Sequence, residues 1–124
     1  MSDNDDEVKA RAVALDDLIH LRGTVEDLAT RVRDFNWDAA PNLVALTPGA
    51  VIEVLSRYVS GEVTAKEIET WADAIEGRED IALPPLFQPV LSTLIFELAN
   101  PEITRSLTVD SALDWSARLR EEPE

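Results

Sequence analysis

The apolar positions of the first 35 residues repeat every seven residues. From Ala14 to Phe35 their spacing alternates between four and three, which is the a/d pattern of a helix that buries one face. The pattern keeps its phase through Gly23, so it predicts one long N-terminal helix. The alternative is a break at Gly23, with Thr24 as the N-cap of a second helix and Asp27 three residues later. The positions of this heptad seam are Ala14, Leu18, Leu21, Val25, Leu28, Val32 and Phe35.

Capping residues delimit the second and third predicted helices. The second begins at the Thr-Pro pair of residues 47–48, a preferred N-cap followed by a proline at the first helical position, and it ends at Gly61. Thr64 and Glu67 have the spacing of a capping box, which predicts the start of the third helix, and Gly77 ends it. The expected inward positions are Val51, Ile52, Leu55, Tyr58 and Val59 in the second helix, and Ile68, Trp71, Ala72 and Ile75 in the third.

Two further helices follow along the chain. The prolines at 84–85 predict the start of the fourth, which ends before the Asn-Pro pair at 100–101 because the residue before a proline disfavours helical backbone. A last helix follows Thr108, and we also expect Trp115 in the core. The expected inward positions are Phe87, Val90, Leu91, Leu94, Ile95 and Leu98 in the fourth helix, and Val109, Ala112, Leu113, Ser116 and Leu119 in the last.

These patterns predict an all-α fold. No stretch alternates apolar and polar residues between hairpin turns as a strand would. We therefore expect a compact bundle or orthogonal array of four to five helices, without a sheet. The length of 124 residues fits one helical domain, which we place at residues 7–120. Acidic tails are expected at residues 1–6 and 121–124.

The charge of the chain narrows the class of partner. The sequence has 25 acidic and 11 basic residues, a net charge of −14. Nucleic acids and anionic membranes are polyanions, so this charge argues against both and favours a basic protein. The N-terminus lacks the basic and apolar regions of a secretory signal, and no apolar run approaches the roughly 20 residues of a membrane helix. We therefore expect a cytoplasmic protein.

Residues suited to catalysis or metal binding are scarce. The chain has one histidine and no cysteine, which excludes disulfides, zinc–thiolate sites and Cys–His chemistry. Asp16 and His20 have a spacing that could ligate a metal, but a surface helical pair is the simpler interpretation. The phosphate-loop, dinucleotide and zinc-protease motifs are absent. We expect no enzymatic activity, no cofactor and no metal site.

Residues 61–80 concentrate negative charge. This stretch holds seven carboxylates and two cations, Lys66 and Arg78. Three of the carboxylates recur at i, i+4 and i+7 opposite the apolar face of the third helix, although like charges at i, i+4 cost a helix a few tenths of a kcal/mol. That cost favours a surface for a basic partner, and the alternative is a face that is only solvated. The candidate partner-binding residues are Glu69, Asp73, Glu76, Glu79 and Asp80, with Glu62 at the rim.

A short motif opens the third helix. Residues 58–65 read Tyr-Val-Ser-Gly-Glu-Val-Thr-Ala and are followed by Glu67 and by Trp71-Ala72. This pattern, Y-x-x-G-E-[IV]-[ST]-A…W, resembles a signature of small bacterial helical proteins. Over about 20 of the 124 residues it is similar to immunity proteins of the colicin D type. The resemblance implies an acidic helical bundle that blocks a basic, tRNA-cutting toxin.

Two hypotheses of function follow. The first is a non-enzymatic, immunity- or antitoxin-like inhibitor that binds a basic bacterial protein, such as a nuclease toxin, through its acidic helix face. The second is a structural protein that self-associates, as a homodimer, through the heptad seam. Salt separates the two, because it screens binding to a basic partner and leaves apolar association intact.

Overall fold

Six α-helices and two short strands make up the part of the chain that the computed structural model describes, residues 3–34, 43–78 and 80–121. The elements are α1 (Asp3–Ile19), α2 (Val25–Arg33), β1 (Val44–Ala45), α3 (Pro48–Val59), α4 (Ala65–Ile75), β2 (Ile81–Ala82), α5 (Gln88–Ala99) and α6 (Val109–Glu121). The mostly helical fold agrees with the prediction, but the described helices exceed the expected four to five.

The first and last helices extend into the segments that we expected to be tails. α1 already begins at Asp3, within the segment 1–6 that we expected to be a tail. At the other end Glu121 is the last residue of α6, and residues 122–124 lie outside the described part of the chain.

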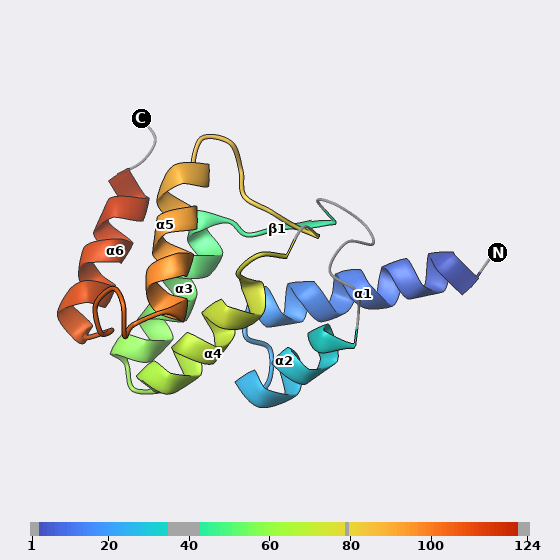
Figure 1. The fold of residues 1–124 in the computed structure, drawn as a ribbon, viewed down its shortest axis with the longest axis horizontal. Helices are drawn as coiled ribbons and strands as arrows, with labels where there is room; N and C mark the ends of the chain where they lie inside the picture. The colour runs from blue at the N-terminus through green and yellow to red at the C-terminus, as the bar shows by residue number, and fades with distance from the viewer. Residues whose placement is uncertain (1–2, 35–42, 79, 122–124) are drawn as a thin grey trace.

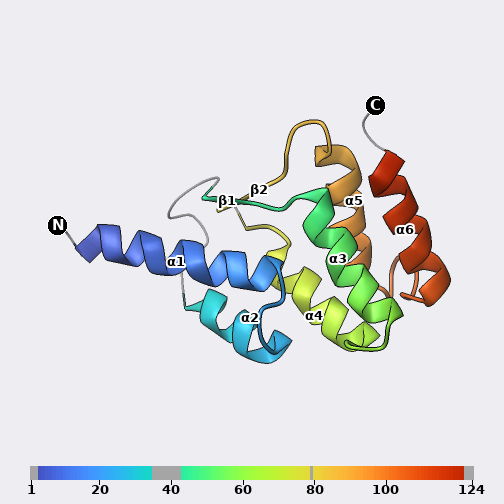
Figure 2. The same cartoon turned by 180° about the vertical axis from the view of Figure 1, so that it is seen from behind.

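The helices form two groups that α4 joins. In both views α3, α5 and α6 lie at one end of the molecule, and α1 and α2 at the other (Figures 1 and 2). α4 lies between them, since it packs against α5 on one side and α2 on the other. α3 packs against α6, and α1 against α2. One continuous apolar core contains side chains from all six helices.

α1 ends at Ile19, and the turn that closes it reaches Leu21, two residues before the glycine that the sequence offered as a break. Leu21 has a φ of 50°, the left-handed conformation in which helices commonly end, usually with glycine. Its amide donates to the carbonyl of Leu18 at 3.1 Å, and the amide of Arg22 donates to that of Asp17 at 2.9 Å. These are the two hydrogen bonds of a Schellman motif. The Leu21 side chain is buried, so burial offsets the backbone strain.

α2 then begins with a capped turn. The Oγ1 atom of Thr24 accepts a hydrogen bond from the amide of Asp27 at 3.2 Å. The prediction of one long N-terminal helix was therefore wrong, and the alternative break was right. The heptad spacing continues across the break because α1 and α2 both direct their seam residues into the same core.

That core also uses the heptad seam. The five seam residues of the described chain from Leu18 to Val32 are at most 2 % exposed, and Phe35 lies outside the described residues. Trp71 of α4 covers part of the seam and donates its indole Nε1–H to the carbonyl of Leu18 at 2.8 Å. The described part of the seam thus lies in the interior of one molecule.

α3 and α4 match their capping signals. Thr47 accepts from the amide of Ala50 at 3.2 Å at the start of α3. At the start of α4, Oγ1 of Thr64 accepts from the amide of Glu67 at 3.1 Å, and Glu67 accepts in return from the amide of Thr64 at 2.8 Å. This reciprocal capping box is the one predicted, and it fixes the direction of α4. The predicted inward residues of α4 are all buried: Ile68, Trp71, Ala72 and Ile75.

α5 and α6 depart from the prediction in detail. α5 begins at Gln88, later than the prolines at 84–85, which lie in the preceding turn and loop. On α6 the predicted inward residues Val109 and Leu113 are 45 % and 51 % exposed, whereas Trp115 is 1 % exposed. The buried stripe of α6 is Ala112, Trp115, Ser116 and Leu119 together with Ser111. The larger indole determines which face of the helix turns inward.

A parallel pair of strands corrects the prediction of a fold without a sheet. Val44 of β1 is opposite Ile81 of β2, and Ala45 is opposite Ala82. Each strand has two residues, too few to show an alternating pattern in the sequence. The pair holds the segment after α4 against the segment before α3, and Ile81 of β2 lines the site described below.

Candidate partner-binding site

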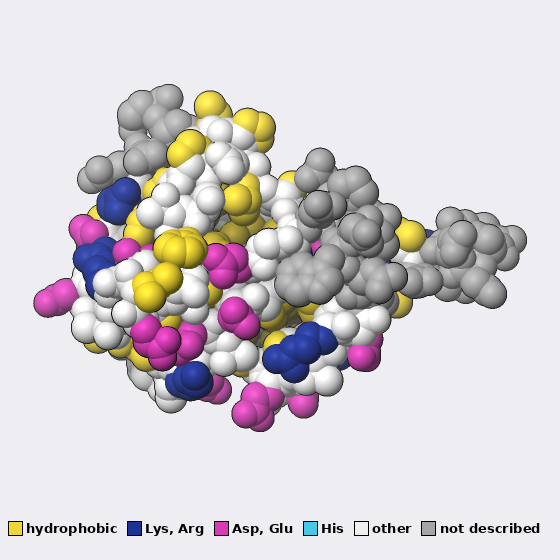
Figure 3. All heavy atoms as spheres, in the orientation of Figure 1, with side chains coloured by type: hydrophobic (Ala, Val, Ile, Leu, Met, Phe, Trp, Pro, Cys, Tyr) yellow, Lys and Arg dark blue, Asp and Glu magenta, His cyan; other side chains and the backbone are white. Residues whose placement is uncertain are grey.

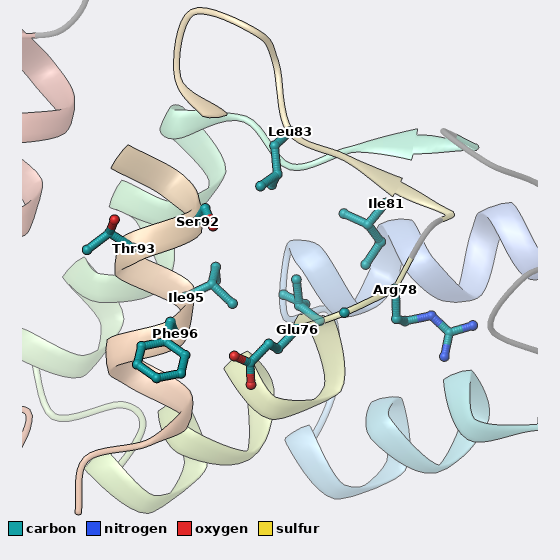
Figure 4. Close-up of a pocket in the computed structure, with 10 residues that line it drawn as sticks. Glu76, Arg78, Ile81, Leu83, Ser92, Thr93, Ile95 and Phe96 are labelled. Atoms are coloured by element: carbon teal, nitrogen blue, oxygen red, sulfur yellow. The ribbon is translucent and has the colours of Figure 1, made fainter. Parts of the chain in front are cut away.

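A pocket of about 580 Å³ opens between the end of α4, β2 and α5. Figure 4 shows Ile95 of α5 pointing toward the side chains of Ile81 and Leu83, which enter from the strand segment opposite. Ser92 lies on the same side of α5 farther along the wall (Figure 4). The lining residues are Ile75, Glu76, Gly77, Arg78, Ile81, Leu83, Ser92, Thr93, Ile95 and Phe96. The pocket is thus mainly apolar with a few polar groups, as ligand-binding pockets usually are.

Glu76 and Phe96 both line this pocket, one from the end of α4 and the other from α5 (Figure 4). Glu76 is the C-cap residue of α4, so the pocket begins where the acidic helix ends. The side-chain nitrogen Nδ2 of Asn100 lies 3.5 Å from the Glu76 carboxylate, which is long for a hydrogen bond. Glu76 itself is half-buried. Phe96 is 45 % exposed, a large aromatic surface left open to solvent. An acid and an aromatic ring thus border one apolar cavity.

The acidic residues predicted on α4 do share a face. Asp73 is exposed, while Glu69 and Glu76 are half-buried on either side of it along the helix. Figure 3 shows carboxylates along the line of α4, with hydrophobic side chains beside them over α5 and a hollow in the surface above. Glu62 is exposed in the turn before α4, where Arg57 approaches it at 3.6 Å. The position of Glu62 at the rim of a partner surface stays a prediction.

Two cations flank this acidic face. Lys66 reaches Glu69 at 3.5 Å within α4. Arg33 of α2 lines a second depression, of about 320 Å³, together with Asp73. Within the described residues Asp73 and Glu76 form no ion pair, so the charge near the pocket is the least compensated part of the face.

Asp80 does not belong to this face. It is 0 % exposed and accepts hydrogen bonds from Arg78 Nε and Nη2 and from Arg11 Nη1, all at 2.9 Å. Arg78 also donates to the carbonyl of Val32 at 3.4 Å. This buried cluster joins α1, α2 and the segment before β2, and it holds the guanidinium of Arg78 away from the pocket (Figure 4). Asp80 is therefore unavailable to a partner, and Glu79 lies outside the described residues.

The histidine pair is a surface feature, as expected. Nε2 of His20 lies 3.7 Å from Asp16, and the stronger partner of Asp16 is Arg22 at 2.7 Å. Burial by itself would raise the pKa of Asp17, but hydrogen bonds from Arg22 and Arg31, with their charges, lower it below its ordinary 3.8. In residues 3–34, 43–78 and 80–121 no group of three or more acidic or histidine side chains is arranged to hold a metal ion.

A second polar cluster joins α5 to α6. Glu97 accepts from Trp115 Nε1 at 2.8 Å and from Arg105 Nε at 2.7 Å. The Glu97 hydrogen bond raises the pKa of Arg105 against the opposing effect of burial. The guanidinium of Arg118 stacks on the Trp115 ring at 4.3 Å. These groups interact with one another across α5 and α6, so the cluster anchors α6.

The pocket is the part of the site that sequence reasoning missed. Ile81 and Leu83 fell in a connecting segment without a helical period, and Phe96 fell on the outer face of a predicted helix. The signal in the sequence was the apolar Ile-Ala-Leu run directly after the acidic stretch.

Comparison with family models, with curated protein sequences and with solved structures finds no match. The immunity-protein resemblance therefore has no further support from relatives. None of the described helices has both the length and the apolar character needed to span a membrane.

Proposed function

We propose that this chain is a non-enzymatic protein-binding domain that binds a basic protein through Glu69, Asp73 and Glu76 of α4, with Glu62 at the rim. In its finer form the proposal is an immunity- or antitoxin-like inhibitor of a basic bacterial toxin, such as a nuclease, in the bacterial cytoplasm. The observation that carries the proposal is that, among the described residues, Asp73 and Glu76 form no ion pair, and that Glu76 lines an apolar pocket.

Electrostatics support a basic partner. The net charge of −14 repels polyanions and attracts cationic surfaces over long range, which raises the rate of association. The carboxylates at i, i+4 on α4 repel each other at a cost to the helix. Asp73 and Glu76, which have no ion-pair partner among the described residues, match what a cationic cleft would require.

The alternative of self-association through the heptad seam receives no support. Leu18, Leu21 and Leu28 are each at most 2 % exposed inside the monomer. A homodimer through these residues would require the core to open, so we do not retain it.

The proposal is tested with a nona-arginine peptide as the cationic probe. Asp73→Lys raises the net charge by two, from −14 to −12. The matched control is Glu53→Lys, which makes the same change at an exposed position of α3. We expect Asp73→Lys to weaken binding at least about fivefold, roughly 1 kcal/mol, and Glu53→Lys by less than about twofold.

Calorimetric titration at low and moderate salt provides the measurement, and affinity should fall steeply as salt rises. Equal losses for the two variants would show that only global charge matters, and the acidic face would then have no special role. The finer form of the proposal is tested by the adjacent genes: a basic, nuclease-like reading frame supports it, and its absence argues against it.

A further inference from the structure

We propose that the pocket between α4, β2 and α5 receives an apolar side chain of the partner, and that a lysine or arginine follows or precedes that side chain in the partner's sequence. This inference rests on the proposed function, because it names the segment that the same face recognises. The occupant is thus a peptide segment that pairs an apolar residue with a cation.

The size and lining of the pocket select the apolar part of that segment. Its volume of about 580 Å³ lies within the roughly 300–1,000 Å³ of ligand-binding pockets. Ile81, Leu83 and Ile95 direct aliphatic carbon into it from two sides (Figure 4). An aliphatic or aromatic side chain would cover this surface and release water from it. A purely polar segment would leave the apolar lining in contact with water, so binding would gain no hydrophobic free energy from the cavity.

The charge at the edge selects the cation. Glu76 lies on the pocket lining, and Asp73 is less than one turn before it on the same helix. The cation on the lining, Arg78, is already bonded to the buried Asp80 and points away from the cavity (Figure 4). The potential at the opening is therefore negative, which disfavours an acidic ligand and favours a Lys or Arg beside the apolar anchor.

Phe96 favours the same ligand. Phe96 is 45 % exposed and lines the same pocket as Glu76 (Figure 4). A guanidinium that pairs with Glu76 would lie at this pocket, and contact with the exposed ring would add cation–π attraction to the ion pair. A carboxylate and an exposed aromatic ring at the edge of an apolar cavity together describe a site for an apolar–basic peptide.

The test selects random peptides displayed on phage against the wild-type protein. We expect enriched sequences with an aliphatic or aromatic residue adjacent to Lys or Arg. The best of them should bind Ser92→Trp, which fills the pocket from an exposed lining position, at least tenfold more weakly. The matched control is Ser56→Trp, at an exposed position of α3 outside the pocket, which should bind within about twofold of wild type.

Two further readouts keep the inference separate from the proposed function. Phe96→Ala, at an exposed site that does not endanger folding, should weaken the selected peptide several-fold. Nona-arginine, which has no apolar anchor, should bind Ser92→Trp as it binds wild type. If Asp73→Lys does not weaken the binding of nona-arginine, the proposed function is contradicted, even if the pocket still binds the selected peptides.

The inference is overturned by enrichment of basic peptides without an apolar position, of apolar peptides without a cation, or of no sequence at all. It is also overturned if Ser56→Trp weakens the selected peptide as much as Ser92→Trp does. Methyl NMR spectra should show the signals of Ile81 and Ile95 shifting on binding. Shifts confined to other parts of the protein would place the peptide elsewhere.

Discussion

Replacement of the buried carboxylate by its amide, Asp80→Asn, is the sharpest test of what holds this fold together. The substitution keeps the shape of the side chain and removes its charge. Asp80 accepts three hydrogen bonds of 2.9 Å from two buried guanidinium groups, those of Arg11 and Arg78. The amide keeps one acceptor oxygen, and its NH₂ group faces donors that it cannot satisfy.

The magnitude follows from the burial of all three groups. Removing one partner of a buried ion pair costs about 3–5 kcal/mol, because the remaining charge is left without its counterion in a medium of low dielectric. Arg11 and Arg78 each have a further interaction, so neither guanidinium loses all of its partners. We therefore expect a loss of about 3 kcal/mol. That is a large share of the roughly 5–15 kcal/mol by which domains of this size are stable.

Urea denaturation followed by circular dichroism measures the loss as a lower midpoint at an unchanged slope. The matched control is Asp114→Asn, which removes an exposed carboxylate 3.5 Å from Arg105 and should change stability by less than about 0.5 kcal/mol. In a double-mutant cycle, Arg11→Met should cost less in the Asp80→Asn background than in wild type. A loss below about 1 kcal/mol for Asp80→Asn, or strict additivity in the cycle, would refute the argument.

Three further predictions concern stability. Trp71→Ala should cost about 3–5 kcal/mol in urea denaturation, because it empties a fully buried site and removes the indole hydrogen bond to α1; a cost near zero would mean that this tryptophan is not core. Thr64→Ala should cost about 0.5–2 kcal/mol through loss of the α4 capping box, whereas Thr64→Ser should cost little. Hydrogen bonds from Arg22 and Arg31 lower the pKa of Asp17 below 3.8, so its contribution is present above about pH 5 and is lost as the pH falls through the folded-state value. The stability difference between wild type and Asp17→Asn should therefore shrink below pH 3.8, and a difference independent of pH would contradict this assignment.

Local signals account for the parts of the fold that the sequence predicts well. The caps at Thr47 and Thr64 determine the starts of α3 and α4, because each involves residues three positions apart. The sequence offered the break after α1 only as the alternative to one long helix, for a physical reason. A leucine in the left-handed conformation carries no sequence signature, and its burial in the core keeps the apolar repeat intact across the turn.

The candidate site was predicted only in part, because its decisive contacts join distant residues. Arg11 and Asp80 are 69 positions apart, and no local pattern shows that this carboxylate turns inward while Asp73 stays outside. The pocket likewise forms only where β2 meets α5. Helical periodicity could therefore place Asp73 and Glu76 on one face, but it could not show the cavity beside them.

The buried charge cluster also changes what the molecule presents to its solvent. Among the described residues, folding takes two cations, Arg11 and Arg78, and one anion, Asp80, largely out of contact with solvent. The net charge of the chain stays −14, and these two arginines are no longer at the surface to pair with the carboxylates that remain there. The folded state therefore repels itself, and added salt should relieve that repulsion and stabilise the fold. Added salt should therefore raise the stability of the free protein and lower its affinity for a cationic partner.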